Sequence, residues 1–515
     1  MLSSALPPLP TLAGVVSIAL LLVKHVKRSR TSPLPPGPKG WPIIGNILDW
    51  PKSQEWLTFM RWSQQYGAPL ALQWDVYVNL RFADSDLLYV NTIGTDVLII
   101  NSNKVAQDLL EKQSSIFSDS VGFGWDFSFM PYGRRWRELR KAFVRKFHPP
   151  ALSHYHPTIL QGTRELLLDF LNTPNDFIKH LRNASGGIIL RVCYGYKVSP
   201  NDDPFVARAQ RALNAMAQTG IHGAYLVDSL PFLKVLPSWV PGAGFKKEAA
   251  EWNPDAALFH KLPVDWVQEC IEKGTAEPSI ASESLEKCRT PEELEGLRAI
   301  LGVAYEAGAD TTVSALSTFI LMMATYPEVQ RKGQAAVDAA FGFGHLPDFT
   351  DDVEIPYVDA IVKEVLRYRP VAPLGLSHRL MEDHIYDGYF LPKGSVVIGN
   401  AWAMLHEESE WGAEPGVFRP ERHLKDGVLT PPSKIPYGTF GYGRRTCAGI
   451  EFAMDQMWLT VTSILACFDI APVEGEKLTG EYTSGMQIFP VDFKCSIKPR
   501  SAAIEQLLRD GVEVA

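Results

Sequence analysis

The sequence predicts a mainly α-helical fold with small β-sheets, built as a single large body behind an N-terminal membrane anchor. Helical periodicity dominates the middle and the end of the chain, and short apolar patterns typical of strands lie between the helices. An apolar run followed by basic residues stands at the N-terminus. No repeat, low-complexity block or long linker interrupts the chain after residue 40, so one body is expected.

The composition is that of a large globular protein. The chain has 515 residues, of which 46% are hydrophobic and 21% charged, which allows an extensive core and does not indicate disorder. The formal net charge of −8 gives no basic excess of the kind that nucleic-acid binding proteins show. We therefore expect no nucleic-acid partner.

Residues 1–30 are predicted to form the anchor. An apolar run from Leu12 to Val23 extends back toward Leu6, and the basic residues follow it between positions 24 and 30. A cleaved signal peptide has the opposite order, whereas basic residues after a span stay in the cytosol. The run is short for a full span, so a peripheral or cleaved segment is the alternative. The proline-rich stretch at 31–40 predicts a stiff hinge between anchor and body.

Three long helices and three short strands are predicted within the body, which covers residues 41–515. The helices are expected at 133–147, 294–326 and 357–369, and the strands at 97–101, near 395–399 and near 493–497. The apolar stretch from Ala315 to Tyr326 has a second membrane span as its alternative. Glu306 and Asp310 belong to the same helical pattern, and charges are costly in a bilayer, which favours a buried core helix.

Six cysteines occur without any Cys-x-x-Cys pair, so neither a cysteine-rich zinc site nor a disulfide framework is expected. Five of them are interpreted as small buried hydrophobes. Cys447 differs because it lies in a glycine-rich loop before an apolar helical pattern at 450–464. The helix dipole and the neighbouring Arg444 and Arg445 favour its thiolate, and the glycines allow a metal or a flat cofactor to approach. A buried free cysteine in a turn is the alternative.

The loop resembles the haem-binding signature of cytochromes P450, Phe-x-x-Gly-x-Arg-x-Cys-x-Gly, at every specified position from Phe440 through Gly443 to Gly449. The resemblance implies a P450-type catalytic domain that binds haem b, with Cys447 as the axial iron ligand and Arg445 paired to a haem propionate. Thiolate ligation favours O–O bond cleavage. The resemblance covers nearly the whole chain after the hinge, and the sequence is most similar to fungal microsomal members of the family.

Two further segments resemble family elements. Glu364 and Arg367 share one face of a predicted helix, and the resemblance implies a buried network with Arg422 that braces the cysteine loop. On the long helix, the segment 307–312 resembles the family's oxygen-activation segment, which implies that Asp310 and Thr311 relay protons. Helix–helix packing through small residues is the alternative interpretation of that segment.

Other residues are expected at the edge of the cofactor and at the surface. Trp136 and Arg140, one helical turn apart, resemble a pair that donates to a propionate, and His378 resembles another propionate contact. The helix at 133–147 is unusually basic for an acidic chain. We expect its residues Arg135, Arg137 and Lys141 to dock an acidic redox partner, NADPH–cytochrome P450 reductase.

The expected substrate is a hydrophobic small molecule. By family analogy the pocket draws on Phe123, Phe127, Ala307, Leu374 and Ile488. The expected reaction inserts one oxygen atom from O2, with electrons from NADPH through a flavin reductase, in a fungal secondary-metabolite hydroxylase at the endoplasmic reticulum membrane with a cytosolic catalytic domain. An isomerase or dehydratase of the same fold, and a haem sensor or carrier without turnover, are the alternatives.

Overall fold

The computed structural model describes residues 32–42, 44–66, 86–120, 124–199, 203–219, 225, 227, 231–240, 242–351, 353–430 and 435–512. The predicted anchor, residues 1–30, lies outside the described residues. The described part of the hinge is tied to the body, because Tyr89 N–H donates to the Pro36 carbonyl (2.9 Å) and Phe390 N–H to the Pro33 carbonyl (2.7 Å). A side chain at Gly37 would meet the Tyr89 carbonyl oxygen at 2.1 Å, which explains the glycine among the prolines.

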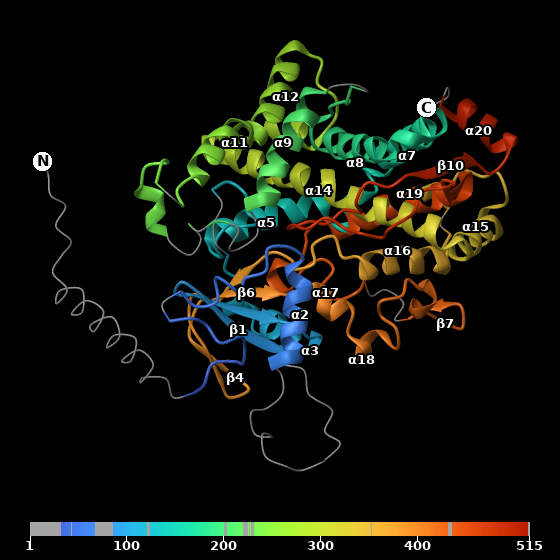
Figure 1. Ribbon diagram of the computed structural model, residues 1–515. Helices are drawn as coiled ribbons and strands as arrows, with labels where there is room; N and C mark the ends of the chain where they lie inside the picture. Colours follow the sequence, from blue (N-terminus) through green and yellow to red (C-terminus); the bar gives the residue numbers. More distant parts are fainter. Residues whose placement is uncertain are drawn as a thin grey trace, which may run out of the picture.

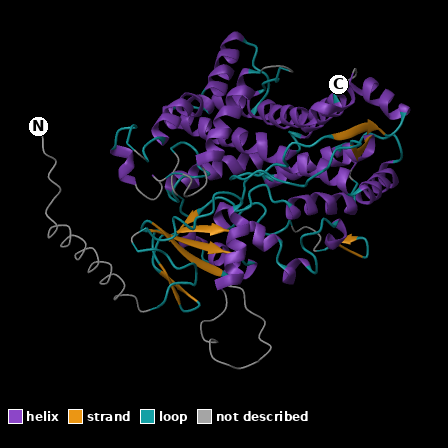
Figure 2. Ribbon diagram, viewed as in Figure 1, coloured by secondary structure: helices purple, strands orange, loops and turns teal. Residues whose placement is uncertain are grey.

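Helices form most of the body (Figures 1 and 2). The α-helices are α2 (Glu55–Tyr66), α3 (Asn103–Ala106), α4 (Ser114–Phe117), α5 (Arg134–Phe147), α6 (Pro149–Leu152), α7 (His156–Asn172), α8 (Phe177–Tyr194), α9 (Pro204–Thr219), α11 (Phe245–Phe259), α12 (Leu262–Lys273), α13 (Ile280–Leu285), α14 (Pro291–Thr325), α15 (Pro327–Phe341), α16 (Pro356–Tyr368), α17 (Ala401–Leu405), α18 (Glu408–Trp411), α19 (Ile450–Cys467) and α20 (Ala502–Val512). Shorter helical turns are η2 (Gln107–Lys112), η3 (Pro174–Asp176), η4 (Pro231–Val235), η5 (Phe349–Asp351), η6 (Pro420–His423) and η7 (Gly443–Arg445).

The strands form one four-stranded sheet and three two-stranded ones. The larger sheet has the order β1 (Leu87–Thr92), β2 (Thr95–Ile100), β6 (Val396–Gly399), β3 (His378–Arg379), and only β2 and β6 run parallel. The smaller sheets pair β9 (Phe468–Pro472) with β10 (Cys495–Pro499), β4 (His384–Tyr386) with β5 (Tyr389–Leu391), and β7 (Leu424–Lys425) with β8 (Val428–Leu429). Figure 2 shows the larger sheet at one end of the molecule and the helices gathered beyond it.

Helix α14 crosses the helical part of the molecule between α8 and α16 (Figure 1). A capping box begins it, in which the Thr290 hydroxyl accepts from Glu293 N–H and the Glu293 carboxylate accepts from Thr290 N–H. Its apolar stretch is long enough to cross a membrane, but 78% of that stretch is buried inside the protein. The helix is therefore a core helix, as its acidic residues predict.

The predicted elements of the body are confirmed. The long helices become α5, α14 and α16, and the strands become β2, β6 and β10, each with ends shifted by a few residues at most. Two apolar clusters meet along α14. One joins its second half to α7, α16 and α19, and the other joins its first half to α5 and α8. This packing holds the middle of α14 against the loop before α19, where the candidate site lies.

Candidate active site

A cavity of about 350 Å³ lies between α14 and the loop that precedes α19. Its lining brings together most of the residues that the sequence analysis selected. These are Phe127, Trp136, Arg140, Ala307, Asp310, Thr311, His378, Phe440, Arg445 and Cys447. Residues more than 300 positions apart in the chain therefore share one space.

Cys447 lines this cavity, three residues before Ile450, the first residue of α19. Its N–H donates to the Phe440 carbonyl (2.8 Å), which closes the loop, and its Sγ accepts from Gly449 N–H at 3.4 Å. Burial raises the pKa of the thiol, while the Gly449 hydrogen bond and the Arg140 charge oppose that rise. A metal that binds this sulfur displaces the proton.

The neighbouring arginines do not act on the sulfur as the sequence analysis expects. The Arg444 guanidinium turns outward to the Tyr132 hydroxyl (2.6 Å). The Arg445 guanidinium binds the carbonyls of Ser118 (2.8 Å) and Met130 (2.6 Å), together with those of Phe127 and Ser128. The prediction that these two side chains stabilise the thiolate is therefore wrong, because Arg140 from α5 is the cation that faces it.

Arg445, Arg140 and Trp136 form one donor edge of the cavity. The Arg445 guanidinium lies over the Trp136 ring, 4.8 Å from its centre, and Arg140 donates to the Thr446 carbonyl. Burial lowers the pKa of Arg445 to about 10, so its charge is held at neutral pH. These donors suit a carboxylate that enters from the cavity.

His378, at the start of β3, also lines the cavity, but its hydrogen bond points elsewhere. Its Nδ1 lies 2.7 Å from the Phe117 carbonyl, to which it donates. Burial lowers the pKa of His378 to about 4, so the ring is neutral and its Nε2 carries no proton. A propionate contact by this histidine stays a prediction, and it requires protonation of Nε2.

The cysteine loop is fixed by contacts on its far side. Gly443 adopts φ +53°, its N–H donates to the Glu111 carboxylate (2.8 Å), and a side chain there would meet the Leu110 carbonyl at 2.1 Å. Gly443 is not among the residues that line the cavity. Close packing against η2 explains this glycine physically, and its contact with a cofactor stays a prediction.

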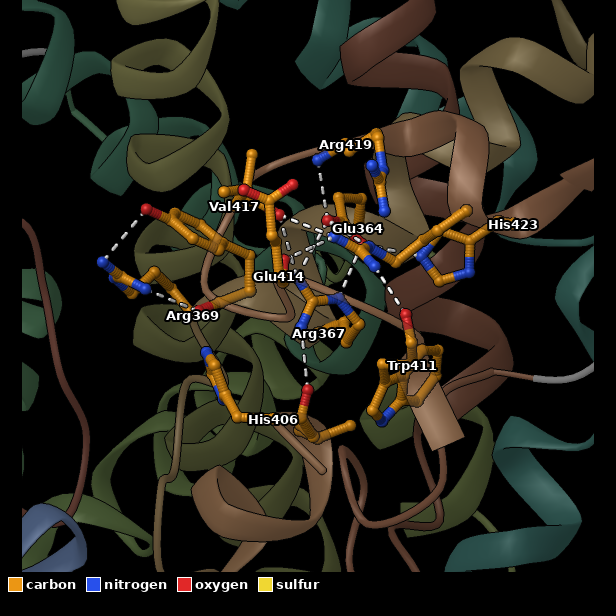
Figure 3. Close-up of polar contacts among 12 residues, drawn as sticks. Glu364, Arg367, Arg369, His406, Trp411, Glu414, Val417, Arg419 and His423 are labelled. Carbon is orange, nitrogen blue, oxygen red and sulfur yellow. Dashed lines mark hydrogen bonds and ion pairs between the residues drawn. The ribbon is translucent and has the colours of Figure 1, made fainter. Parts of the chain in front are cut away.

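Glu364, Arg367 and Arg422 form a buried charged network. Figure 3 shows Arg367 and His423 beside the Glu364 carboxylate. Arg367 donates twice to Glu364, at 2.7 and 2.9 Å, and Arg422 donates once at 2.9 Å. His423 Nε2 also lies 2.9 Å from the carboxylate, and Arg419 N–H lies 2.8 Å from it, two contacts that the sequence analysis missed. Burial alone would raise the pKa of Glu364, but the hydrogen bonds from Arg367 and His423 lower it to about 2.

The network reaches the cysteine loop through α17. Arg367 donates to the carbonyl of Leu405 (2.8 Å), and the hydroxyl of the buried Tyr442 lies 3.6 Å from the sulfur of the adjacent Met404. Tyr442 belongs to the cysteine loop and packs so closely against Gly399 that a side chain there would meet its ring at 2.6 Å. The charged network and the cysteine loop thus pack against the same short helix, α17, and are connected through it.

Asp310 and Thr311 line the cavity from the middle of α14, opposite the loop. The Thr311 hydroxyl donates to the Ala307 carbonyl at 2.6 Å, as its place in a helix predicts. The Asp310 carboxylate lies 3.8 Å from Arg182 Nε on α8. Burial raises the pKa of Asp310 and Arg182 partly opposes that rise. Arg182 is 41% exposed, so this pair connects the cavity with solvent.

A family model described as cytochrome P450 matches residues 35–490 of the chain. The chain belongs to the cytochrome P450 family. Cytochrome P450 monooxygenase ple1 of Rhodocybe pseudopiperita is 38% identical to this P450 and aligns over 97% of this chain and 96% of its own length. Tryptamine 4-monooxygenase of Psilocybe cyanescens is 35% identical to this P450 and aligns over 96% of this chain and 98% of its own length. The match makes this protein a P450 monooxygenase, an oxidoreductase similar to many fungal members.

The family implies haem iron, and the residues of this P450 fit it. In the part of the chain that the structure describes, no group of three or more His, Cys, Asp or Glu side chains could hold a metal. Cys447 is the only cysteine that the cavity lining contains within those residues. One sulfur ligand suits an iron whose other ligands come from a macrocycle, and the donor edge suits the macrocycle's carboxylates.

The substrate side agrees with the sequence analysis only in part. Phe127 and Ala307 line the cavity, whereas Phe123 lies outside the described residues. Leu374 and Ile488 do not line it, so their expected role in the pocket is not supported. Leu374 packs instead against the apolar cluster beside the larger sheet, which includes Phe59.

The position of Ile488 follows from the alternation of an extended segment. Gln487 and Phe489 face the cavity, and Ile488 between them is buried on the opposite side, with its N–H on the Val371 carbonyl (2.9 Å). The segment was therefore predicted correctly, but Ile488 lies on the face of it that points away from the cavity. Further lining residues come from helices that the sequence analysis did not select: Ile189 of α8 and Leu213, Asn214, Met216 and Ala217 of α9.

Glu306 is a lining residue whose chemistry the sequence analysis missed. It lies one helical turn before Asp310, and it is 8% exposed. Burial raises the pKa of Glu306 well above its usual range, and the buried Asp126, from the segment before α5, raises it further through its charge and a hydrogen bond. The available signal was a glutamate one helical turn before Asp310, within the stretch from residue 299 to residue 325 where these two are the only charged residues.

Proposed function

We propose that this P450 inserts one oxygen atom of O2 into a C–H bond of a hydrophobic small molecule, with electrons from NADPH delivered by a membrane-bound flavin reductase. The observation that carries the proposal is the cavity itself, in which Cys447 faces Asp310 and Thr311 across an apolar space. Phe127, Phe489 and other apolar side chains close it, which favours a lipophilic ligand.

Each cavity residue has a proposed task. The bound haem supplies the iron at which O2 is activated. Cys447 Sγ binds the iron, while Arg445, Arg140 and Trp136 hold the propionates. Asp310 receives protons near Arg182 at the solvent side, and Thr311 assists their relay by holding the proton donor in the cavity. The Thr311 hydrogen already points to Ala307, so its oxygen lone pairs are free to orient a donor toward the reaction.

The proposed substrates are fungal secondary metabolites. A fungal relative named tryptamine 4-monooxygenase acts, by its name, on the small molecule tryptamine, which supports a small-molecule substrate. The test is co-expression with a reductase, a panel of lipophilic metabolites and ¹⁸O2. The expected product carries one labelled oxygen atom. A product without label would favour an isomerase or dehydratase, and haem without any turnover would favour a sensor or carrier.

We also propose that residues 1–30 anchor the protein in the endoplasmic reticulum membrane with its catalytic body in the cytosol. The order of the apolar run and the basic residues supports this orientation. Protease treatment of intact microsomes is expected to digest the body. Full protection of the body would contradict the orientation.

Thr311→Ala is expected to uncouple reductant use from product formation. Without the hydroxyl, proton delivery slows, and general acid help of this kind contributes about 10²–10⁴-fold. The measurement is the ratio of product formed to NADPH consumed, which should fall several-fold while the haem spectrum is kept. Thr325→Ala is the matched control, because Thr325 makes the same bond to the carbonyl one turn earlier, at 2.7 Å, near the end of α14. Unchanged coupling in Thr311→Ala would remove the proposed role.

Charge reversal on α5 is expected to impair reductase-supported turnover. Arg135, Arg137 and Lys141 are exposed on the helix that carries Trp136 and Arg140 on its other face. Replacing all three by glutamate should lower turnover about tenfold or more at low salt and flatten its salt dependence, since steering is lost. The ferrous–CO spectrum after chemical reduction should stay unchanged.

Three exposed lysines of other segments provide the control for this charge change. They are Lys287, Lys425 and Lys477. Their triple reversal produces the same change in net charge and should leave turnover close to that of the wild type. If both triple variants lose turnover equally, the effect belongs to net charge, and α5 is not the docking face.

A further inference from the structure

Gln487 is a polar side chain in an apolar part of the cavity wall. It belongs to the extended segment 486–489, in which Met486, Gln487 and Phe489 all line the cavity. The Gln487 side chain is half-buried, whereas Ile488 beside it is 1% exposed and points the other way. An amide at this position requires an explanation, because an aliphatic side chain would complete the apolar surface.

Hydrogen bonds to two other elements fix the direction of the Gln487 side chain. The Ile488 N–H donates to the Val371 carbonyl (2.9 Å), and the Ile488 carbonyl accepts from the hydroxyl of Ser314 on α14. Ser314 is 1% exposed, so the second of these bonds is protected from water. Because successive residues of an extended segment face opposite sides, anchoring Ile488 away from the cavity turns Gln487 into it.

The Gln487 amide is not committed to the protein. Within the described part of the chain, no residue hydrogen-bonds to it. Two other polar side chains of the lining are already partnered, since Asn214 accepts from Gln210 (3.1 Å) and Ser120 donates to the Ser377 carbonyl (3.4 Å). A primary amide offers two N–H donors and a carbonyl acceptor. A ligand that displaces water from this amide without replacing its hydrogen bonds is therefore disfavoured.

We propose that Gln487 determines substrate specificity by hydrogen-bonding a neutral oxygen group, a hydroxyl or a carbonyl, on an otherwise apolar substrate. The inference rests on the proposed monooxygenase function and adds the substrate class. Ser314, which anchors the segment, lies three residues after Thr311, about 4.5 Å along the helix axis. Gln487 and the relay residues therefore border the same part of the cavity. The expected substrate is a lipophilic molecule that already carries oxygen, and not a plain hydrocarbon.

Binding to the haem-loaded protein tests the proposal without turnover. The probes are 1-tetralone, 1-tetralol and tetralin, which share one bicyclic skeleton and carry a carbonyl, a hydroxyl or neither. Gln487→Leu, similar in size, should weaken the binding of the ketone and the alcohol about tenfold or more and leave tetralin binding unchanged or tighter. Gln218→Leu on α9 is the matched control, because Gln218 is exposed and does not line the cavity.

Ser314→Ala tests whether the anchored segment positions Gln487. Loss of the hydroxyl frees the Ile488 carbonyl, so the preference for 1-tetralone over tetralin should fall several-fold. In the Gln487→Leu background the same change should leave that preference unaltered, because the amide is already absent. Ser314→Thr keeps a hydroxyl and should retain most of the preference. A purely structural role of Ser314 would instead weaken all three probes equally in both backgrounds.

Two results would overturn the proposal. An unchanged ratio of ketone to tetralin affinity in Gln487→Leu, or an equal loss for all three probes, would show that the amide does not select an oxygen group. A failure of the proposed function is separately visible. It would appear as a missing ferrous–CO band or missing ¹⁸O incorporation, whereas these binding measurements use neither NADPH nor O2.

Discussion

Replacing Cys447 by alanine is expected to abolish the ferrous–CO absorbance band of thiolate-ligated haem and all product formation. The cavity lining contains no other cysteine among the residues that the structure describes, so no neighbour can substitute for the sulfur. Loss of this ligand removes the electron donation that favours O–O cleavage. The measurements are the difference spectrum of the purified protein and product formation with a reductase, both of which should fall below detection.

Two further variants separate ligation from folding. Cys447→Ser keeps the size of the side chain and offers oxygen in place of sulfur, so haem can be retained while the thiolate band is lost. Cys270→Ala, on the partly exposed face of α12, should keep both band and turnover. A normal band in Cys447→Ala would contradict the assignment of the iron ligand and the reaction proposed from it.

The sequence predicts well what a short segment determines by itself. The cysteine loop lies within ten residues, so its glycines, its cysteine and the helix that follows are read directly from one short segment. Likewise, Glu364 and Arg367 are three residues apart on α16, so helical geometry alone brings them together. The apolar periodicity of α5, α14 and α16 also identifies these helices without tertiary information.

The sequence predicts poorly what tertiary packing determines. The face that Ile488 presents depends on its pairing with Val371, and no local pattern fixes the register of that extended segment. The outward turn of Arg444 depends on Tyr132, more than 300 residues earlier. For the same reason, the meeting of Asp126 with Glu306 could not be seen in the sequence. Long-range contacts decide where such side chains point.

Breaking the Glu364 network is expected to cost more stability than any surface change. Glu364 and Arg367 are both fully buried, so Glu364→Ala leaves two guanidinium groups without their carboxylate. Removal of one partner from a buried ion pair costs about 3–5 kcal/mol. Because the network reaches Tyr442 through Leu405 and Met404, the cysteine loop should loosen and haem should be lost. Denaturant unfolding and the haem absorbance per protein measure the two effects.

Two controls separate bracing of the cysteine loop from general destabilisation. Glu505→Ala breaks only the exposed pair with Arg509 and should cost less than about 1 kcal/mol. Leu167→Ala leaves a cavity in the fully buried core on α7 and should cost about 2–5 kcal/mol, similar to the network variant. If the network braces the loop, Glu364→Ala loses haem more readily than Leu167→Ala at equal stability. Equal haem retention in these two variants would show that the network stabilises the fold but does not specifically brace the cysteine loop.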